Sequence, residues 1–442
     1  MMRKRQIFTV ILLSAVLGTG CSFGSGTGLN TEEQSDANSD IFFGISEEQK
    51  ELMGEYELME AEDDIEHIEG EAEATAEDEV YTESDNGTFE DIQEEQGTEE
   101  LSIIMVGDIL LHTPVEEAAY DESEQKYNFD FIFANTKDEI EGADIAIVNE
   151  EVIIGGTGLG ISGYPAFNAP YEIGDALVKT GFDVICHATN HALDKGAKGI
   201  LNCTDYWEEI SEKYPDITMV GIHESEEDAE EIELIDKNGI TLAILNYTYG
   251  TNGIPLPADM PYAVDMLDEE KVVKDLKRAE EMADFTIVIP HWGTEYSLEA
   301  TGYQKKWAAL MAQNGADLII GAHPHVIEPV EWIDGSVLCY YSLGNFVNWT
   351  SGTGTGVANR MVGGMADVRI KKDADGKVNI EDYGIIPLVC HVQSGREGVT
   401  VYRFDEYNSE LALVNEINKQ DSAFDYEYCN ELIHRVWGDL IE

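Results

Sequence analysis

The stretch ADLIIGAHPH, residues 316–325, decides how this chain is interpreted. The apolar run from Leu318 to Ile320 is typical of a buried strand, and Gly321 follows it directly. His323 and His325 come next, with a proline between them that fixes the backbone. Surface His-x-His pairs also occur by chance, so this stretch alone does not establish a site.

The same pattern, an apolar run followed by polar side chains, recurs along the chain. Apolar runs that end in polar side chains are LSIIMVGD (101–108), ADIAIVNEE (143–151), FDVICHATNH (182–191) and DFTIVIPHWG (284–293). Further strand candidates are ITMVGI (217–222), ITLAILNYT (240–248) and VLCYYSLGNF (337–346). Helical patterns such as KVVKDLKRAEEMA (271–283) and YQKKWAALMAQNG (303–315) lie between them. Strands that alternate with helices predict an α/β domain with largely buried sheets.

The last part of the chain, residues 351–442, has a different pattern. GGMADVRIKKDADGKVNIEDYGIIPLVCHV (363–392) predicts a β-hairpin, with ADG in its turn, followed by another strand. Two helical segments follow. We expect these strands and helices to complete the domain formed by residues 101–350.

Polar side chains stand at five predicted strand ends. They are Asp108, Asn149, Glu151, Asn190, His191, His291, His323 and His325. In open α/β sheets, ligands bind beyond the carboxyl ends of the strands. Carboxylate, amide oxygen and imidazole are the ligands of divalent ions such as Mn, Zn or Fe. The pattern therefore predicts a metal site.

Each of these residues also has an ordinary explanation. An Asp after a strand is commonly a turn former or a helix cap, so Asp108 alone predicts little. His191 by itself could be a hydrogen-bonded core histidine. It is the convergence at five strand ends that favours metal binding. His112, four residues after Asp108, could also reach the site.

The order of motifs GD, NxE, NH, HWG-E, GAHPHV and SLGNF resembles the CapA family of capsule and poly-γ-glutamate synthesis proteins. That family is similar to the calcineurin-like metallophosphoesterases. The resemblance runs from about residue 102 to 348 and implies a four-layer α/β/β/α sandwich with two divalent metal ions. It implies metal ligands at Asp108, Glu151, Asn190, His291, His323 and His325, with Glu151 or Asn149 as the bridge.

The resemblance also implies that His191 lies beside the metal ligands or acts as a catalytic acid. The sequence departs from the family pattern in two places. Ile109 and Leu110 follow Asp108, where metallophosphoesterases have Asp-x-His, and Thr189 stands where the family often has a second asparagine. Both departures leave open whether one metal subsite is complete.

Residues 1–20 are predicted to be a lipoprotein signal peptide. Three basic residues precede the apolar stretch IFTVILLSAVLG, which is too short for a comfortable membrane span. The segment ends in GTGC, which predicts lipidation of Cys21 and attachment to the extracellular face of a bacterial cell membrane. Leu17 lies four residues before Cys21 rather than the usual three. Ordinary secretion and an uncleaved anchor are the alternatives.

Residues 21–100 are predicted to be a disordered acidic linker. Positions 22–100 contain 28 acidic residues and one basic residue, Lys50. Such a segment cannot bury enough apolar surface to offset the entropy of ordering. The five cysteines after Cys21 are widely spread, which favours buried free thiols over a disulfide framework.

The charge of the chain limits its partners. The formal net charge is -63, with 89 acidic and 26 basic residues, which argues against nucleic acid as a partner. An anionic polymer such as poly-γ-glutamate would also be repelled unless cations mediated the contact. Capsule-synthesis membrane proteins are further expected partners.

Three functions remain open at this point. The first is a surface-anchored, metal-dependent protein of capsule or poly-γ-glutamate biosynthesis or export that binds or hydrolyses the polymer. The second is an extracellular two-metal phosphoesterase. The third is a catalytically inactive, metal-stabilised scaffold. The resemblance concerns a pathway role, so it does not by itself establish catalysis.

Overall fold

The computed structural model describes residues 99–350, 352–393 and 398–441. The predicted signal peptide, Cys21 and the acidic linker up to residue 98 lie outside the described residues. Within the described ranges, no helix combines the length and the apolar character needed to cross a bilayer.

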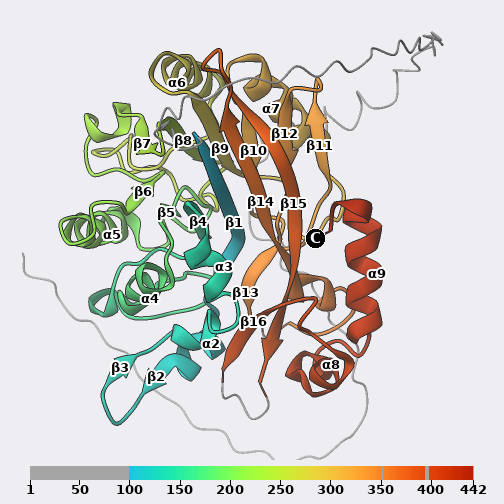
Figure 1. The fold of residues 1–442 in the computed structure, drawn as a ribbon. Helices are drawn as coiled ribbons and strands as arrows, with labels where there is room; N and C mark the ends of the chain where they lie inside the picture. The colour runs from blue at the N-terminus through green and yellow to red at the C-terminus, as the bar shows by residue number, and fades with distance from the viewer. Residues whose placement is uncertain (1–98, 351, 394–397, 442) are drawn as a thin grey trace, which may run out of the picture. The chain divides into compact units, whose positions relative to one another are not determined.

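Two sheets form the centre of the described domain (Figure 1). In the described part of the chain, the first sheet has eight strands: β1 (Glu100–Leu110), β4 (Ile145–Glu150), β5 (Val184–Cys186), β6 (Thr218–Val220), β13 (Asn345–Asn348), β14 (Val362–Lys372), β15 (Val378–Val392) and β16 (Val399–Arg403). Strands β1, β4, β5 and β6 are parallel, whereas β14, β15 and β16 continue the sheet antiparallel from the other side of β1. Strands β14, β15 and β16 therefore share one sheet with the first strand.

The second sheet has six strands in the described ranges: β7 (Glu233–Lys237), β8 (Ile240–Thr248), β9 (Phe285–His291), β10 (Leu318–Ile320), β11 (Val330–Ile333) and β12 (Val337–Tyr340). Its four inner strands, β8, β9, β10 and β12, are parallel to one another, and the edge strands β7 and β11 are antiparallel to β8 and β12. Their carboxyl ends consequently lie at one edge of the sheet, and GAHPH follows β10 there.

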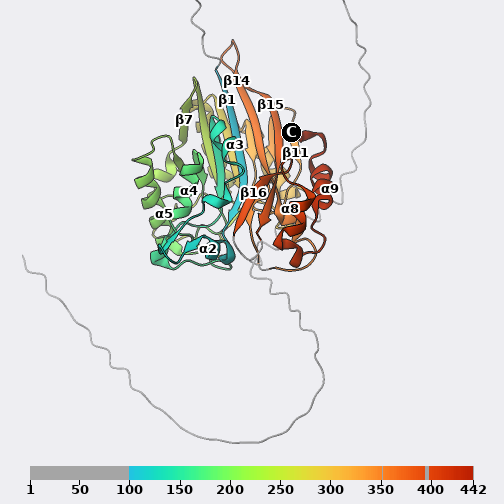
Figure 2. The same ribbon diagram turned by 60° about the horizontal axis from the view of Figure 1, so that its bottom comes forward.

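Helices surround the two sheets. They are α2 (Thr113–Ala119), α3 (Lys137–Gly142), α4 (Glu172–Thr180), α5 (Gly196–Ser211), α6 (Glu269–Met282), α7 (Gly302–Gln313), α8 (Ser409–Val414) and α9 (Tyr426–Trp437). Shorter elements are β2 (Tyr120–Asp121), β3 (Lys126–Tyr127), η1 (Asp130–Ile132), η2 (Thr157–Leu159), η3 (Asp228–Glu230), η4 (Ala358–Met361), η6 (Glu416–Lys419) and η7 (Gly438–Leu440). In the turned view of Figure 2, α4 and α5 lie on one side of the domain and α8 and α9 on the other.

The alternation of side chains along the strands of the second sheet shows how the layers are arranged. On β8 and β9, residues such as Leu242 and Ile287 face the core shared with the first sheet, while Ala243 and Val288 pack with α6 and α7. Because successive side chains of a strand point to opposite faces, the second sheet lies between the first sheet and these helices. Helices α4 and α5 pack on the first sheet. The fold is the predicted four-layer α/β/β/α sandwich.

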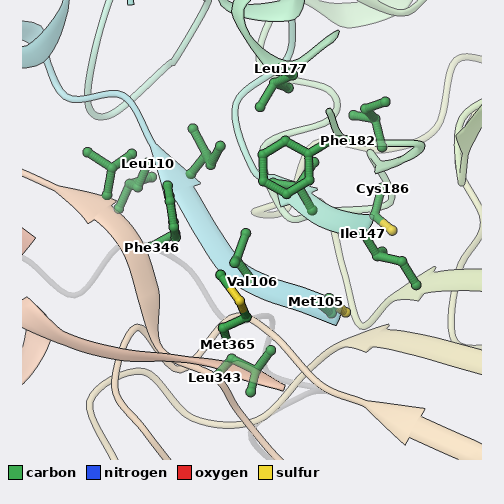
Figure 3. Close-up of a cluster of buried hydrophobic side chains, with 14 of the residues drawn as sticks. Met105, Val106, Leu110, Ile147, Leu177, Phe182, Cys186, Leu343, Phe346 and Met365 are labelled. Atoms are coloured by element: carbon green, nitrogen blue, oxygen red, sulfur yellow. The ribbon is translucent and has the colours of Figure 1, made fainter. Parts of the chain in front are cut away.

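The core is continuous around β1 (Figure 3). Val106 pairs with Met365 of β14 on one side, and Ile147 of the neighbouring β4 is fully buried on the other. Strand β1 is hydrogen-bonded to β4, β13 and β14, which explains why its apolar run is almost unbroken. The five cysteines of the described residues are free and buried, as expected.

Candidate metal centre

The carboxyl end of β1 positions Asp108. The Asp108 amide donates a hydrogen bond to the Gly344 carbonyl at 3.0 Å, so β1 and the SLGNF segment approach closely. A Cβ added at Gly107 would lie 1.9 Å from that carbonyl oxygen. The glycine of the GD motif is therefore required for this approach, which holds the Asp108 carboxylate in place.

The next strand, β4, brings Asn149 and Glu151 beside Asp108. Asn149 Nδ2 donates to Asp108 Oδ1 at 2.9 Å. Glu151 directly follows β4, is fully buried, and has its backbone carbonyl bonded by the Thr189 hydroxyl at 2.8 Å. Thr189, at the place where the sequence departs from the family pattern, thus supports the backbone of a candidate ligand.

The second sheet supplies the imidazoles. His291 is the last residue of β9, and its Nε2 lies 2.9 Å from Asn190 Oδ1, which reaches over from the loop after β5. His323 and His325 follow β10 with φ angles of 101° and 60°. Positive φ is uncommon for residues with a side chain and concentrates at functional sites, where the surrounding structure maintains the strain.

The two sheets together form two groups of ligand atoms. One group contains Glu151, His291 and His323, and the other contains Asp108, Glu151 and His325. Within each group the ligand atoms lie within 4.8 Å of one another, and all five side chains are buried. Glu151 belongs to both groups, which is the position that a bridging carboxylate would occupy. Asn149 instead donates to Asp108.

The partners that these side chains lack test whether metal ions fit. Both carboxylate oxygens of Glu151, Asn149 Oδ1 and His323 Nδ1 are buried without a hydrogen-bond partner in the described part of the chain. A buried carboxylate without a hydrogen bond is costly, and native proteins satisfy such groups with hydrogen bonds or ions. Oxygen and neutral imidazole nitrogen are suitable ligands for divalent ions, so these residues fit them.

The local electrostatics agree with this fit. Burial lowers the pKa of His291 and of His323 well below the usual value, which favours neutral imidazoles, and each neutral imidazole has one nitrogen lone pair that can bind a metal ion. Burial also raises the pKa of Glu151 well above its usual value, and the Asp108 carboxylate adds to this rise. At His325 burial lowers the pKa, but the Glu151 and Asp108 carboxylates outweigh it and raise the pKa to about 10. The carboxylates of Asp108 and Glu151 therefore favour additional positive charge beside them.

His191 lies beside the two groups and is held by its own partners. Its Nδ1 lies 2.7 Å from Asp194 Oδ2, and the same carboxylate oxygen accepts the Phe167 amide hydrogen bond at 2.7 Å. With Nδ1 directed at Asp194, Nε2 faces Glu151 and lies 4.0 Å from its Oε1. A histidine oriented by a carboxylate can hold a proton on the nitrogen that faces the site.

All eight predicted residues thus lie around one edge of the two sheets. Sequence reasoning did not identify Asp194 and Asn252, which contact His191, and it found no role for Asn345, which contacts His325. Asn345 Oδ1 lies 3.1 Å from His325 Nδ1, and Asn252 Nδ2 lies 3.3 Å from His191 Nδ1. SLGNF was a usable signal for Asn345, whereas Asn252 lies in a loop without a motif. His112 belongs to neither group, and its ring packs on Phe167 at 5.3 Å.

Comparison with known proteins gives a family match over most of this domain. The model of the family described as "Bacterial capsule synthesis protein PGA_cap" matches residues 102–350. The "PGA biosynthesis protein CapA" of Bacillus subtilis (strain 168) is 35% identical over 187 residues, which cover 39% of this chain and 45% of that protein. The "Capsule biosynthesis protein CapA" of Bacillus anthracis is 29% identical over 268 residues, covering 57% and 61%. The chain therefore spans less than two thirds of the length of either relative.

Solved structures are more distant. Haemophilus influenzae NAD nucleotidase has a TM-score of 0.37 and 13% identity, covering 76% of this chain and 66% of that chain. A 5'-nucleotidase precursor from Thermus thermophilus has a TM-score of 0.37 and 12% identity, covering 76% and 58%.

Proposed function

Because this chain belongs to the family of bacterial capsule synthesis proteins, we propose that it acts in capsule or poly-γ-glutamate biosynthesis as a metal-dependent hydrolase of the polymer. The observation that carries the proposal is the buried Glu151 carboxylate. It has no hydrogen-bond partner in the described ranges and is shared by two groups of ligand atoms.

The residues divide into holding and reacting roles. Glu151, His291 and His323 would hold one divalent ion, and Asp108, Glu151 and His325 a second, with Asn149 and Asn190 beside them. Bound ions supply Lewis acidity, which polarises a carbonyl or phosphoryl oxygen and stabilises the charge that develops on it.

The chain's own proton chemistry lies at His191. The Asp194 carboxylate, 2.7 Å from Nδ1, orients the ring so that Nε2 faces the ligand groups, where it would donate a proton to the leaving group. In hydrolysis of an amide, water adds to the carbonyl carbon, the C–N bond breaks and the departing nitrogen takes this proton. The proton that the water loses passes to solvent, and His191 takes a proton from solvent before the next cycle. The His191–Asp194 pair favours an enzyme over an inactive scaffold, because a scaffold has no use for a proton donor directed at the ligand groups.

The experiment that tests the proposal measures metal binding and hydrolysis together. We expect the purified chain to bind Mn²⁺ and to cleave poly-γ-glutamate, and Glu151→Gln to lose at least about 100-fold in Mn²⁺ affinity and the activity with it. Glu117→Gln, an exposed acidic position, is the matched control. Turnover of phosphodiesters without cleavage of the polymer would favour the extracellular phosphoesterase. Unchanged Mn²⁺ binding by Glu151→Gln would overturn the proposed centre.

We also propose that Cys21 carries a lipid that holds the protein at the extracellular face of the membrane. The basic residues, the short apolar stretch and the cysteine after small residues support this location. In cells, Cys21→Ser should move the protein from the membrane fraction to the soluble fraction. Retention of Cys21→Ser in the membrane fraction would contradict lipidation.

A further inference from the structure

Arg360, in η4, lies at the rim of the metal centre and takes part in neither group of ligand atoms. Its guanidinium carbon lies 3.7 Å from the centroid of the Tyr296 ring, and that ring lies 6.0 Å from the ring of His325. The Arg360 backbone carbonyl also accepts a hydrogen bond from Asn345 Nδ2 at 3.0 Å, and Asn345 Oδ1 contacts His325. Side chain and backbone thus both fix Arg360 relative to a candidate ligand.

The guanidinium of Arg360 lacks the carboxylate partners that three other described arginines have. Arg278, Arg369 and Arg403 each form an ion pair with at least one carboxylate. Among the described residues, Arg360 forms no ion pair within 4.0 Å, and its Nε is buried without a hydrogen-bond partner. An arginine that stays unpaired in a chain with 89 acidic residues has donors available for a ligand.

Access to this position is open. Tyr296 is 44% exposed, and Arg360 is half-buried on top of it. Stacking on an aromatic ring orients the planar guanidinium while leaving its edge free, and that edge matches the two oxygens of a carboxylate or phosphate. An anion bound there would lie beside the metal centre rather than within it.

We propose that Arg360, held on the Tyr296 ring, binds an anionic group of the substrate next to the bond that is cleaved. This inference rests on the proposed hydrolytic function and specifies its substrate class: a molecule with a carboxylate or a phosphate close to the scissile bond. A γ-linked glutamate chain has this property, since each residue carries a free α-carboxylate adjacent to the γ-amide. A phosphate ester offers the same anionic chemistry from a different source.

The test uses the full chain loaded with Mn²⁺ and measures binding by calorimetry. The probes are inorganic phosphate and tri-γ-glutamate, and the variants are Arg360→Gln and Arg360→Lys. Arg435→Gln, an exposed arginine on α9, is the matched control. We expect Arg360→Gln to weaken binding of one probe about 10- to 100-fold, as for loss of a charged hydrogen bond, and Arg435→Gln to leave it unchanged. The probe that loses affinity identifies whether carboxylate or phosphate is the ligand.

Arg360→Lys keeps the positive charge but lacks the planar guanidinium edge, so it should bind the probe with an intermediate affinity. This variant also provides a test if Arg360→Gln does not fold. With substrate, Arg360→Gln should raise KM more than it lowers kcat. A purely structural role would lower the Mn²⁺ content instead. The inference is overturned if both variants retain Mn²⁺ and bind both probes as tightly as the unaltered chain. It is overturned equally if neither probe binds the loaded chain. In both cases Mn²⁺ binding and polymer cleavage still report separately on the proposed function.

Discussion

At the scale of single residues, the position of His191 leads to a sharp prediction. His191→Asn removes the proton donor but leaves both groups of ligand atoms intact. We expect kcat for polymer cleavage to fall about 10²- to 10⁴-fold while the Mn²⁺ content stays the same. The measurement is steady-state kinetics together with metal analysis, with the exposed His434→Asn as control. Full activity of His191→Asn would remove it from the mechanism.

The site residues that the sequence predicted lie at strand ends, whereas those that it did not predict lie in loops and short turns. Asp108, Glu151 and His291 end or follow apolar runs, and that pattern is visible in a single sequence. Asp194 and Arg360 lie in loops or short turns, where no periodicity marks them. Their proximity to the centre depends on long-range packing, as in the contact of Arg360 with Tyr296. A single sequence contains no direct signal for such contacts.

At the scale of elements, strand positions were predictable and strand partners were not. The predicted strand 240–248 coincides with β8, whereas the run 182–191 forms a strand only over β5, up to Cys186. Beyond it the chain turns so that the Thr189 hydroxyl can bond the Glu151 carbonyl. The pairing of β14 with β1 joins segments about 260 residues apart, and local propensity does not specify it.

Glu328 connects the segment after β10 with α7 and α9, and its burial leads to a prediction about how stability depends on pH. It follows the His-Pro-His turn, accepts a hydrogen bond from Gln304 of α7, and its backbone carbonyl accepts one from Trp437 of α9. Burial raises the pKa of Glu328 to about 8, and the Gln304 hydrogen bond only partly opposes this. The folded chain therefore binds this proton more tightly than the unfolded chain does. Stability should fall as pH rises from about 4.5 to about 8.

Glu328→Gln should remove this part of the pH dependence. In EDTA, the unaltered chain should lose up to a few kcal/mol of unfolding free energy between pH 5 and pH 8 through Glu328, and the variant should lose less. Glu116, whose pKa burial also raises to about 8, contributes with the same sign and keeps some slope in the variant. Urea unfolding at the two pH values measures the difference. An identical slope in both proteins would contradict the assignment.

At the scale of the whole molecule, the proposed contact with the polymer should depend on charge. The formal net charge of -63 opposes approach of another polyanion, so ions at the metal centre and Arg360 should be needed for binding. We expect poly-γ-glutamate to bind in Mn²⁺ and its affinity to fall by at least about 10-fold on adding EDTA. Co-sedimentation with the polymer measures this. Equal binding in EDTA would place the contact elsewhere.

The origin of the candidate ligands in two sheets has a consequence for resistance to unfolding. An ion shared by Glu151 and His291 would fasten the end of β4 to the end of β9, so the sandwich could not open without releasing it. At a free concentration of about 100 times its dissociation constant, such an ion adds about 2.7 kcal/mol against unfolding. The cation supply of the surroundings would then set how long the chain withstands proteases, in addition to whether it is active.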